Sequence, residues 1–554
     1  MKSISRLLAL LLCLAMCLSL AACGGSGSSA PAETAAEEPA DDAPAADEPV
    51  AEEPAEDDYK VFVYGTDANS TTFDPASDLQ TNSGSLLVHA VGDALWSVDL
   101  DGNMKYKLAE SVDYSAEALD ITLKEGVKFS NGDDMTASDV LFTFRHIASQ
   151  PRTASMYACM DLENAEIVDD YHLVIPMNYY DAALIDLLGN ASSLILDEEV
   201  AGADGYAFDW LIGTGPYMLK GDGVTDKSGW EESVQYTLVR NPEYWGEEPY
   251  YDEIDVCFYS KEATRYADLQ SGKLDAAYLT EATYINNLSK GAVPETSLIT
   301  IEENTIDVFT LATVVNDASG EPGEPGAFAD INVRKAFAHC LDIPTIVESL
   351  GEGVYSPANN VVTESSWVYE DLGAYEYDPA LAAEYLAAAG YSVDNPLNIT
   401  MYCEGTAWNA AVAEAAQSYC AAIGINLDLS GVADFGTILP HLLAHEVQIS
   451  IGYPSNGSGN DPANLLQQMS PGSDNSMLAT RDEHMAELFT QGQQETDHAA
   501  REAIYKEFLQ LLHDGYYVIP IDVRTKNYGV KDIHTSFGAA LDASNQLDPA
   551  LLTD

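Results

Sequence analysis

The alternation and spacing of apolar residues predict a mixed α/β protein that begins near Tyr59. Strict alternation favours strands, and Asp-Gly and Asn-Gly pairs between alternating segments favour hairpin turns. Thr136 precedes apolar positions with helical spacing, which predicts a capped helix. The expected elements are a strand over 59–64, a hairpin from 95–100 and 103–108, a second hairpin from 118–123 and 126–129, and a helix over 137–148.

The later part of the chain has clearer helix boundaries. Asp378-Pro379 is typical of a helix start, and Gly390 and Gly424 are typical of helix ends. The expected elements are helices over 379–389, 407–423 and 498–514, and strands over 397–402, 425–429 and 516–523. The order strand, helix, strand over 397–429 predicts a β-α-β unit.

The first 58 residues differ from the rest. Lys2 and Arg6 precede the apolar segment 7–20, which is too short to span a bilayer comfortably and predicts an export signal over 1–22. The sequence Leu20-Ala21-Ala22-Cys23 resembles the lipobox of bacterial lipoproteins, which implies that Cys23 carries a lipid; an ordinary cleavage site with an incidental cysteine is the alternative. Residues 24–58 hold 12 acidic and no basic residues, so 23–58 reads as an anchored, disordered tether.

Composition excludes several function classes. The 554 residues carry 24 basic and 90 acidic side chains, a net charge of −66, which repels phosphate backbones and excludes nucleic acid as a partner. The length and a 46% apolar content fit several domain-sized units. The five cysteines after Cys23 form no C-x-x-C pair, which argues against a disulfide framework or a zinc site.

Motifs for chemistry are also missing from the sequence. His441 and His445 share a helical spacing but have no cysteine nearby, so core or surface histidines are the better interpretation. The chain has no G-x-S-x-G elbow, P-loop or zincin motif. We therefore expect no enzyme, no cofactor, no metal site and no catalytic residue.

Separated blocks of the sequence resemble the solute-binding proteins of peptide-type ABC importers, the extracytoplasmic family 5 with oligopeptide, dipeptide and nickel receptors. Each block is weak alone, but they occur in the family's order over nearly all of 59–540. They are Thr72-Phe73-Asp74-Pro75, 107–111, 123–132 with 136–140, Gly213-Thr214-Gly215-Pro216-Tyr217, 240–245, 270–275, 330–342 and 382–390.

The resemblance implies an α/β fold of the periplasmic-binding-protein-like II class, with two lobes, a hinge and a sheet-rich extension. Two lobes joined by crossing strands can close on a ligand. The expected segments are lobe 1 over 59–100 and 201–312, its extension subdomain over 101–200, lobe 2 over 313–480, and the crossover and return to lobe 1 over 481–554.

The resemblance also implies where ligand is bound, between the lobes. In lobe 1 it points to a loop that could pair its backbone with an extended peptide, although a simple Gly/Ser/Asn turn is equally compatible. Its residues are Asn82, Ser83, Gly84 and Ser85. Thr214 and Gly215 lie in a tight turn that could approach the ligand, or be only a turn.

In lobe 2 the family places ligand contacts at two strand ends. Peptide receptors hold the ligand's ammonium with an aspartate just before Asp461-Pro462; counting along this chain puts Ser458 or Asn456 there instead, and Tyr453 nearby. Dipeptide receptors clamp the ligand carboxylate with an arginine where this chain has Glu404, Trp408 and Asn409. Lys335 and Arg334 are the only basic residues over 313–480, so a short anionic ligand finds no guanidinium fork.

The predicted function is that of a lipid-anchored receptor on the outer face of the cell membrane. It captures a peptide or peptide-like solute and delivers it to an ABC permease with its ATPase subunits, acting as a monomer. Longer peptides, or cationic and neutral ligands stacked on Trp408 and Tyr453, fit best. The alternatives are a receptor for an oligosaccharide, nickel chelate or haem, and a surface enzyme or interaction lipoprotein on the same fold.

Overall fold

The computed structural model describes residues 59–67, 73–75, 86, 89–98, 104–150, 154–189, 193–231, 234–316, 325–452, 461–471, 473, 476–541 and 547–553. The proposed signal, Cys23 and the tether lie outside these residues. Among the described helices, none combines the length and the apolar character needed to cross a bilayer.

One twelve-stranded sheet runs through the described protein. Its main path is β16-β15-β17-β13-β18-β12-β1-β11-β10-β8, with β14 paired to β18 and β9 paired to β10. The strands are β1 (Val61–Thr66), β8 (Tyr217–Leu219), β9 (Trp230–Glu231), β10 (Gln235–Arg240), β11 (Glu253–Phe258), β12 (Ala276–Leu279), β13 (Thr296–Leu311), β14 (Ser356–Pro357), β15 (Leu397–Glu404), β16 (Ile425–Ala433), β17 (Ile449–Gly452) and β18 (Val518–Lys531).

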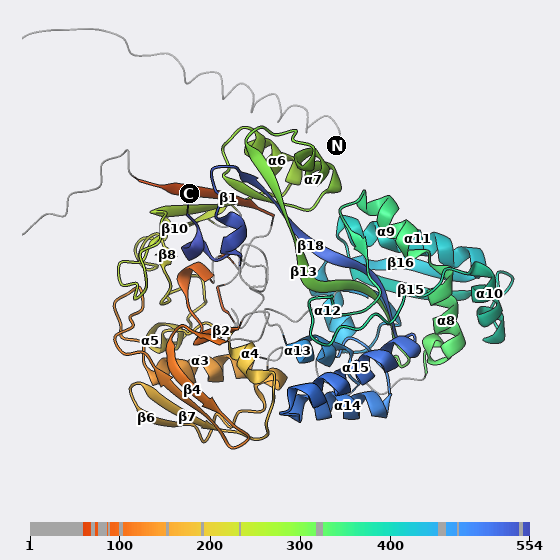
Figure 1. Ribbon diagram of the computed structural model, residues 1–554, viewed down its shortest axis with the longest axis horizontal. Helices are drawn as coiled ribbons and strands as arrows, with labels where there is room; N and C mark the ends of the chain where they lie inside the picture. Colours follow the sequence, from red (N-terminus) through yellow and green to blue (C-terminus); the bar gives the residue numbers. More distant parts are fainter. Residues whose placement is uncertain are drawn as a thin grey trace, which may run out of the picture. The chain divides into compact units, whose positions relative to one another are not determined.

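Two long strands connect the ends of this sheet. β13 and β18 pair antiparallel from Thr296 opposite Lys531 to Thr310 opposite Val518, with register shifts around Asp307. At one end β18 pairs with β12, and at the other β13 pairs with β17. Figure 1 shows β13 and β18 side by side between the helices α6 and α7 and the strands β15 and β16. We call β12, β1, β11, β10 and β8 the first half-sheet, and β16, β15 and β17 the second.

Each half-sheet has its own core. Strand β1, which confirms the strand predicted over 59–64, lies between β11 and β12 in parallel, and its Phe62 and Tyr64 are buried with Ile254 and Val256. Helices α6 (Glu262–Gln270) and α7 (Ala282–Ser289) pack on the same half-sheet through Leu269, Ile285 and Leu288.

The second half-sheet contains the predicted β-α-β unit. β15 pairs in parallel with both β16 and β17, and α11 (Ala407–Ile423) connects β15 to β16. Thr406 caps this helix, and Gly424 ends it at φ 104°, a left-handed conformation that glycine adopts without strain. Four further helices complete this region: α8 (Ile331–Cys340), α9 (Ile343–Gly351), α10 (Pro379–Ala388) and α12 (Phe435–Leu443). The β-α-β prediction is confirmed.

A separate antiparallel sheet follows the order β4-β5-β7-β6, covered by α3 (Ala137–Ser149). Its strands are β4 (Ala109–Tyr114), β5 (Ala118–Leu123), β6 (Glu166–Asp169) and β7 (His172–Pro176). The predicted pairing of 118–123 with 126–129 is wrong: β5 pairs with β4 and β7. Residue 128 instead bridges Asp134 across the Asn131-Gly132 turn, because a two-residue turn pairs its immediate neighbours.

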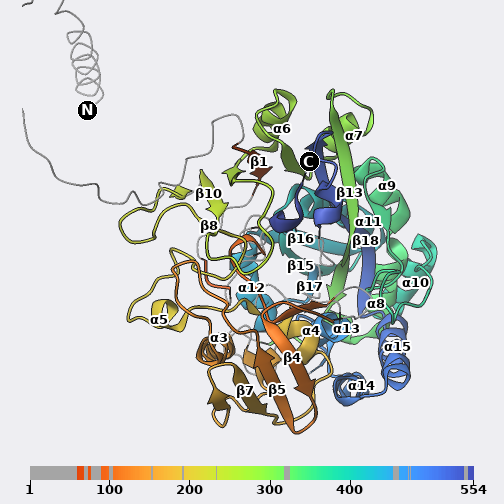
Figure 2. The same ribbon diagram turned by 60° about the vertical axis from the view of Figure 1, so that its left-hand side comes forward.

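The first predicted hairpin is confirmed as β2 (Trp96–Val98) paired with β3 (Met104–Tyr106). Short helices near this sheet are α4 (Leu184–Leu188) and α5 (Glu198–Ala201). Figure 2, turned by 60°, shows α3 beside β5 and β7, with α5 on the other side of α3 from the strands.

The last helices form one buried cluster with β13 and β18. They are α13 (Pro462–Leu466), α14 (Glu483–Gln494) and α15 (His498–Asp514). The strand predicted over 516–523 is longer, because β18 continues to Lys531. Cys159, Cys257, Cys340, Cys403 and Cys420 all carry free thiols. The lobe boundaries expected from the sequence stay predictions.

Candidate ligand-binding site

Several of the predicted ligand-binding residues lie outside the described residues. They are Asn82, Ser83, Gly84, Ser85, Tyr453, Asn456 and Ser458. The structure describes the other six, which lie in three separate places: Glu404, Trp408 and Asn409; Asp461; and Thr214 and Gly215.

Glu404, Trp408 and Asn409 lie where β15 ends and α11 begins. Thr406 starts the helix because its hydroxyl accepts the Asn409 amide at 3.1 Å. This places Asn409 on the buried side of α11 and leaves Glu404 and Trp408 half-buried. The Trp408 indole stacks on Tyr355 with ring centroids 4.2 Å apart, and its Nε1 donates to Asp522 Oδ1 at 3.0 Å. Trp408 therefore reaches β18.

Asp522 belongs to a pair of buried carboxyl groups. It lies directly opposite Asp307 in the register of β18 and β13, and opposed residues of an antiparallel pair point to the same face. Asp307 is 3% exposed and Asp522 is 0% exposed. Within the described residues, Asp307 Oδ1 and Asp522 Oδ2 have no hydrogen-bond partner. Burial, reinforced by the like charges, raises the pKa of both groups.

The nearby basic residues also come from β18. Glu303 Oε1 lies 3.3 Å from Lys526 Nζ, and Glu303 Oε2 lies 3.5 Å from Arg524 Nε. Although burial opposes it, these two cations hold the pKa of Glu303 below its usual range. Arg524 and Lys526 lie outside 313–480, the range in which cations for the ligand were expected, so neither was predicted. Arg524 also acts on Asp307 and Asp522, but burial outweighs it at both.

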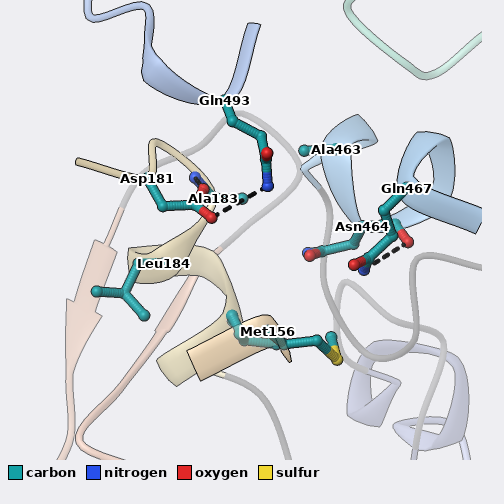
Figure 3. Close-up of a pocket in the computed structure, with 9 residues that line it drawn as sticks. Met156, Asp181, Ala183, Leu184, Ala463, Asn464, Gln467 and Gln493 are labelled. Carbon is teal, nitrogen blue, oxygen red and sulfur yellow. Dashed lines mark hydrogen bonds between the residues drawn. The ribbon is translucent and has the colours of Figure 1, made fainter. Parts of the chain in front are cut away.

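A second contact region joins 181–186 to the helices α13 and α14. Ala182 N donates to Gln493 O at 2.8 Å, and Asp186 Oδ2 accepts from Asp461 N at 3.0 Å. Figure 3 shows Gln493 directed at Asp181, with Asn464 and Gln467 on the opposite side. The cavity among these residues has a volume of about 20 Å³, which is room for about one water molecule. We call this region the seam; the cavity within it is too small for a solute.

Asp461 forms several of the contacts in the seam. Its carboxylate caps α13 by accepting from Ala463 N at 2.9 Å, and it forms a two-bond ion pair with Arg501, with Nη2 to Oδ1 at 2.7 Å. Both carboxylate oxygens are thus engaged by the chain itself. The assignment of Asp461 as a ligand-binding residue stays a prediction.

Thr214 and Gly215 are packed against the chain's own backbone. Thr214 is fully buried, with Oγ1 3.5 Å from Asp93 Oδ2, and Gly215 N donates to Val91 O at 2.9 Å. A Cβ on Gly215 would lie 2.6 Å from Ala90 O. The glycine is needed because two backbone segments approach here.

Gly215→Ala is expected to lower the free energy of unfolding by about 1–3 kcal/mol, the usual range for overpacking. The clash is with backbone, which cannot rotate away. Chemical denaturation measures the effect, and Gly405→Ala is the control, because a Cβ there would meet its nearest atom at 3.6 Å and the backbone is not left-handed. An unchanged midpoint for Gly215→Ala would contradict this packing.

The two histidines of the sequence analysis each contact their own chain. His441 Nδ1 lies 2.6 Å from Glu446 Oε2, and His445 Nε2 lies 2.9 Å from Ser476 O. Within the described residues, no three His, Cys, Asp or Glu side chains are grouped as a metal site would require.

Three residues next to Trp408 were not predicted as part of the site: Asp307, Asp522 and Tyr355. A signal was present, because Thr-Ile-Asp307-Val-Phe and Ile-Pro-Ile-Asp522-Val each place one acidic residue within an apolar strand. A buried charge in a strand is costly unless it is paired, and such residues mark functional sites more often than surface charges do.

Comparison with known proteins shows the family. The model "Bacterial extracellular solute-binding proteins, family 5 Middle" matches residues 103–476, well over half of the chain. The protein belongs to this family of bacterial extracellular solute-binding proteins, which is a family of binding proteins and not of enzymes.

The relatives found are distant. A putative ABC transporter peptide-binding protein of Brucella ovis is 27% identical over 337 residues, 59% of this chain and 60% of the relative. Oligopeptide-binding protein OppA of Bacillus subtilis is 24% identical over 465 residues, 77% of this chain and 81% of OppA. The first match thus spans only about 60% of that relative's length.

A solved structure shows the fold. NikA from Brucella suis, in complex with Fe(III)-EDTA, superposes with a TM-score of 0.75 at 23% identity, covering 89% of this chain and 99% of NikA. The expected fold class, the α/β fold of cluster C periplasmic binding proteins, is confirmed.

Proposed function

We propose that this protein is the lipid-anchored substrate-binding component of an ABC importer and captures a peptide or peptide-like solute. One observation carries the proposal: Trp408, from the second half-sheet, is bonded to Asp522 on β18, a strand shared with the first half-sheet. A ligand that touches Trp408 therefore acts on the strands that join the two halves. The ligand would favour the closed form by its higher affinity for that form.

The peptide class is supported by the names of the Brucella ovis and Bacillus subtilis relatives. The anchor is supported by the Ala21-Ala22-Cys23 sequence, and the acidic tether would keep the receptor near the membrane while letting it reach the permease and its ATPase subunits. Because the NikA structure holds Fe(III)-EDTA, a metal chelate is the second candidate ligand.

Native mass spectrometry of the protein purified from cells that make it tests the ligand class. We expect one bound small molecule per chain that fragments into successive amino-acid masses. A bound species that contains a metal or sugar would reject the peptide class. No bound species, and no binding from a peptide digest added afterwards, would reject the binding function.

A further inference from the structure

We infer that Asp307 and Asp522 together receive a cationic group of the ligand, such as an ammonium or guanidinium. The inference rests on the proposed function and adds the charge of the ligand group at this site. The cation would thus be bound by residues of the two long strands, β13 and β18, and not by the loop before Asp461.

The charges around the two carboxyl groups favour a cation. The electrostatic neighbours in this group are four acidic residues, Glu303, Asp307, Glu404 and Asp522, and two basic residues, Arg524 and Lys526, so its net charge is −2 when both aspartates are ionised and −1 when they share a proton. Both basic residues already form ion pairs with Glu303. The negative excess is therefore centred on the Asp307 and Asp522 pair.

The hydrogen bonding of the pair is incomplete. Trp408 occupies one oxygen of Asp522, whereas Asp522 Oδ2 and Asp307 Oδ1 have no partner among the described residues. A buried carboxylate oxygen without a donor is costly, and a ligand cation with several N–H groups would supply the missing donors and the missing charge. Without such a ligand, the pair is expected to hold a proton, which agrees with the raised pKa of both groups.

The pair itself is buried, but the side chains around it are partly exposed. Its surroundings include the partly exposed side chains of Tyr355, Glu404, Trp408 and Arg524. Two of these, Tyr355 and Trp408, are stacked aromatic rings. Aromatic faces next to carboxylates suit a cation on an apolar stem, such as a lysine side chain.

The test is calorimetric titration of the full-length protein with tetralysine, tetraalanine, N-acetylated tetraalanine, tetraglutamate and spermidine. The variants are Asp307→Asn and Asp522→Asn, with Glu302→Gln as the control, because Glu302 is an exposed acid on the same strand. Asparagine keeps the shape and, at position 522, an oxygen that can accept the Trp408 bond. Thermal melting of each variant checks that it is folded.

We expect a cationic probe to bind to the wild-type protein. Each aspartate variant should weaken this binding about tenfold to a hundredfold, the range for a charged hydrogen bond, and Glu302→Gln should change it less than threefold. A loss of binding on acetylation of tetraalanine would identify the group as the terminal ammonium.

The outcomes separate this inference from the proposed function. Peptides that bind equally with and without a cationic group, with N-acetylated tetraalanine as tight as tetraalanine and tetralysine, or that bind equally to wild type and both aspartate variants, would overturn the inference and leave peptide binding standing. If spermidine binds to the wild-type protein but not to the two aspartate variants, and no peptide binds, the inference is supported and the peptide class is rejected. No binding of any cationic probe would overturn it.

Discussion

Arg501→Ala is expected to lower the free energy of unfolding by about 3–5 kcal/mol, the largest effect of any change considered for this protein. The Arg501 side chain is 8% exposed and pairs with Asp461, which is 11% exposed. Removing the cation leaves a buried carboxylate without its counter-ion. Arg501 Nε also donates to Gly492 O at 2.8 Å, and the guanidinium lies over Trp367 and Tyr505, so packing is lost as well.

Lys506→Ala on the same helix is the matched control. Lys506 pairs with Glu502 one turn away, and both side chains are about one third exposed, so we expect a loss of no more than about 1 kcal/mol. Urea unfolding of both variants measures the difference. Equal losses for the two variants would contradict a buried, structural role for the Arg501 and Asp461 pair.

Asp522→Asn is expected to stabilise the protein at alkaline pH, although it alters the proposed binding site. Burial, and next to it the charge of Asp307, raises the pKa of Asp522 to about 8, and burial raises that of Asp307 to about 6. Between about pH 4 and pH 8 the folded chain therefore keeps a proton that the unfolded chain releases. Stability falls as the pH rises through this window, and asparagine removes that loss.

At pH 8.5 we expect Asp522→Asn to raise the free energy of unfolding by on the order of 2–4 kcal/mol, since one pKa unit corresponds to about 1.4 kcal/mol. The full shift of Asp522 is not recovered, because part of it comes from the coupled carboxyl group of Asp307, which is still present in the variant. Glu303, Glu404, Arg524 and the Trp408 indole face the same pair and are unchanged in the variant. Thermal unfolding from pH 4 to pH 9 measures the effect. If the melting temperatures of wild type and variant differ by the same amount at every pH, Asp522 does not have the raised pKa described above.

Local sequence signals predicted four helices, α3, α10, α11 and α15, with bounds within one residue of those observed. Asp378 and Thr406 accept from the first turns of α10 and α11, as their positions before proline and apolar residues indicated. The glycines at 390 and 424 adopt the left-handed conformation that ends a helix. A cap and a terminating glycine act on residues within one or two helical turns, so the local sequence is enough to predict them.

Strand partners and buried charges could not be obtained in that way. Alternation identified β5 but not its partners β4 and β7, because the period of two sets the faces of a strand and not its neighbour. Likewise, the two acidic residues next to Trp408 come from β13 and β18, which are distant from it in sequence. The family resemblance indicated the Trp408 region, but only the strand register shows that Asp307 and Asp522 are opposed.

The most direct test of the proposed function is the intrinsic fluorescence of Trp408 during titration with peptide. Because its indole contacts both Tyr355 and Asp522, a ligand at this site should alter its emission in a saturable way with one site per chain. We predict that Trp408→Phe, with the other five tryptophans intact, loses most of this change. Binding that leaves Trp408 emission unchanged, or an identical response in Trp408→Phe, would contradict the assignment of this site.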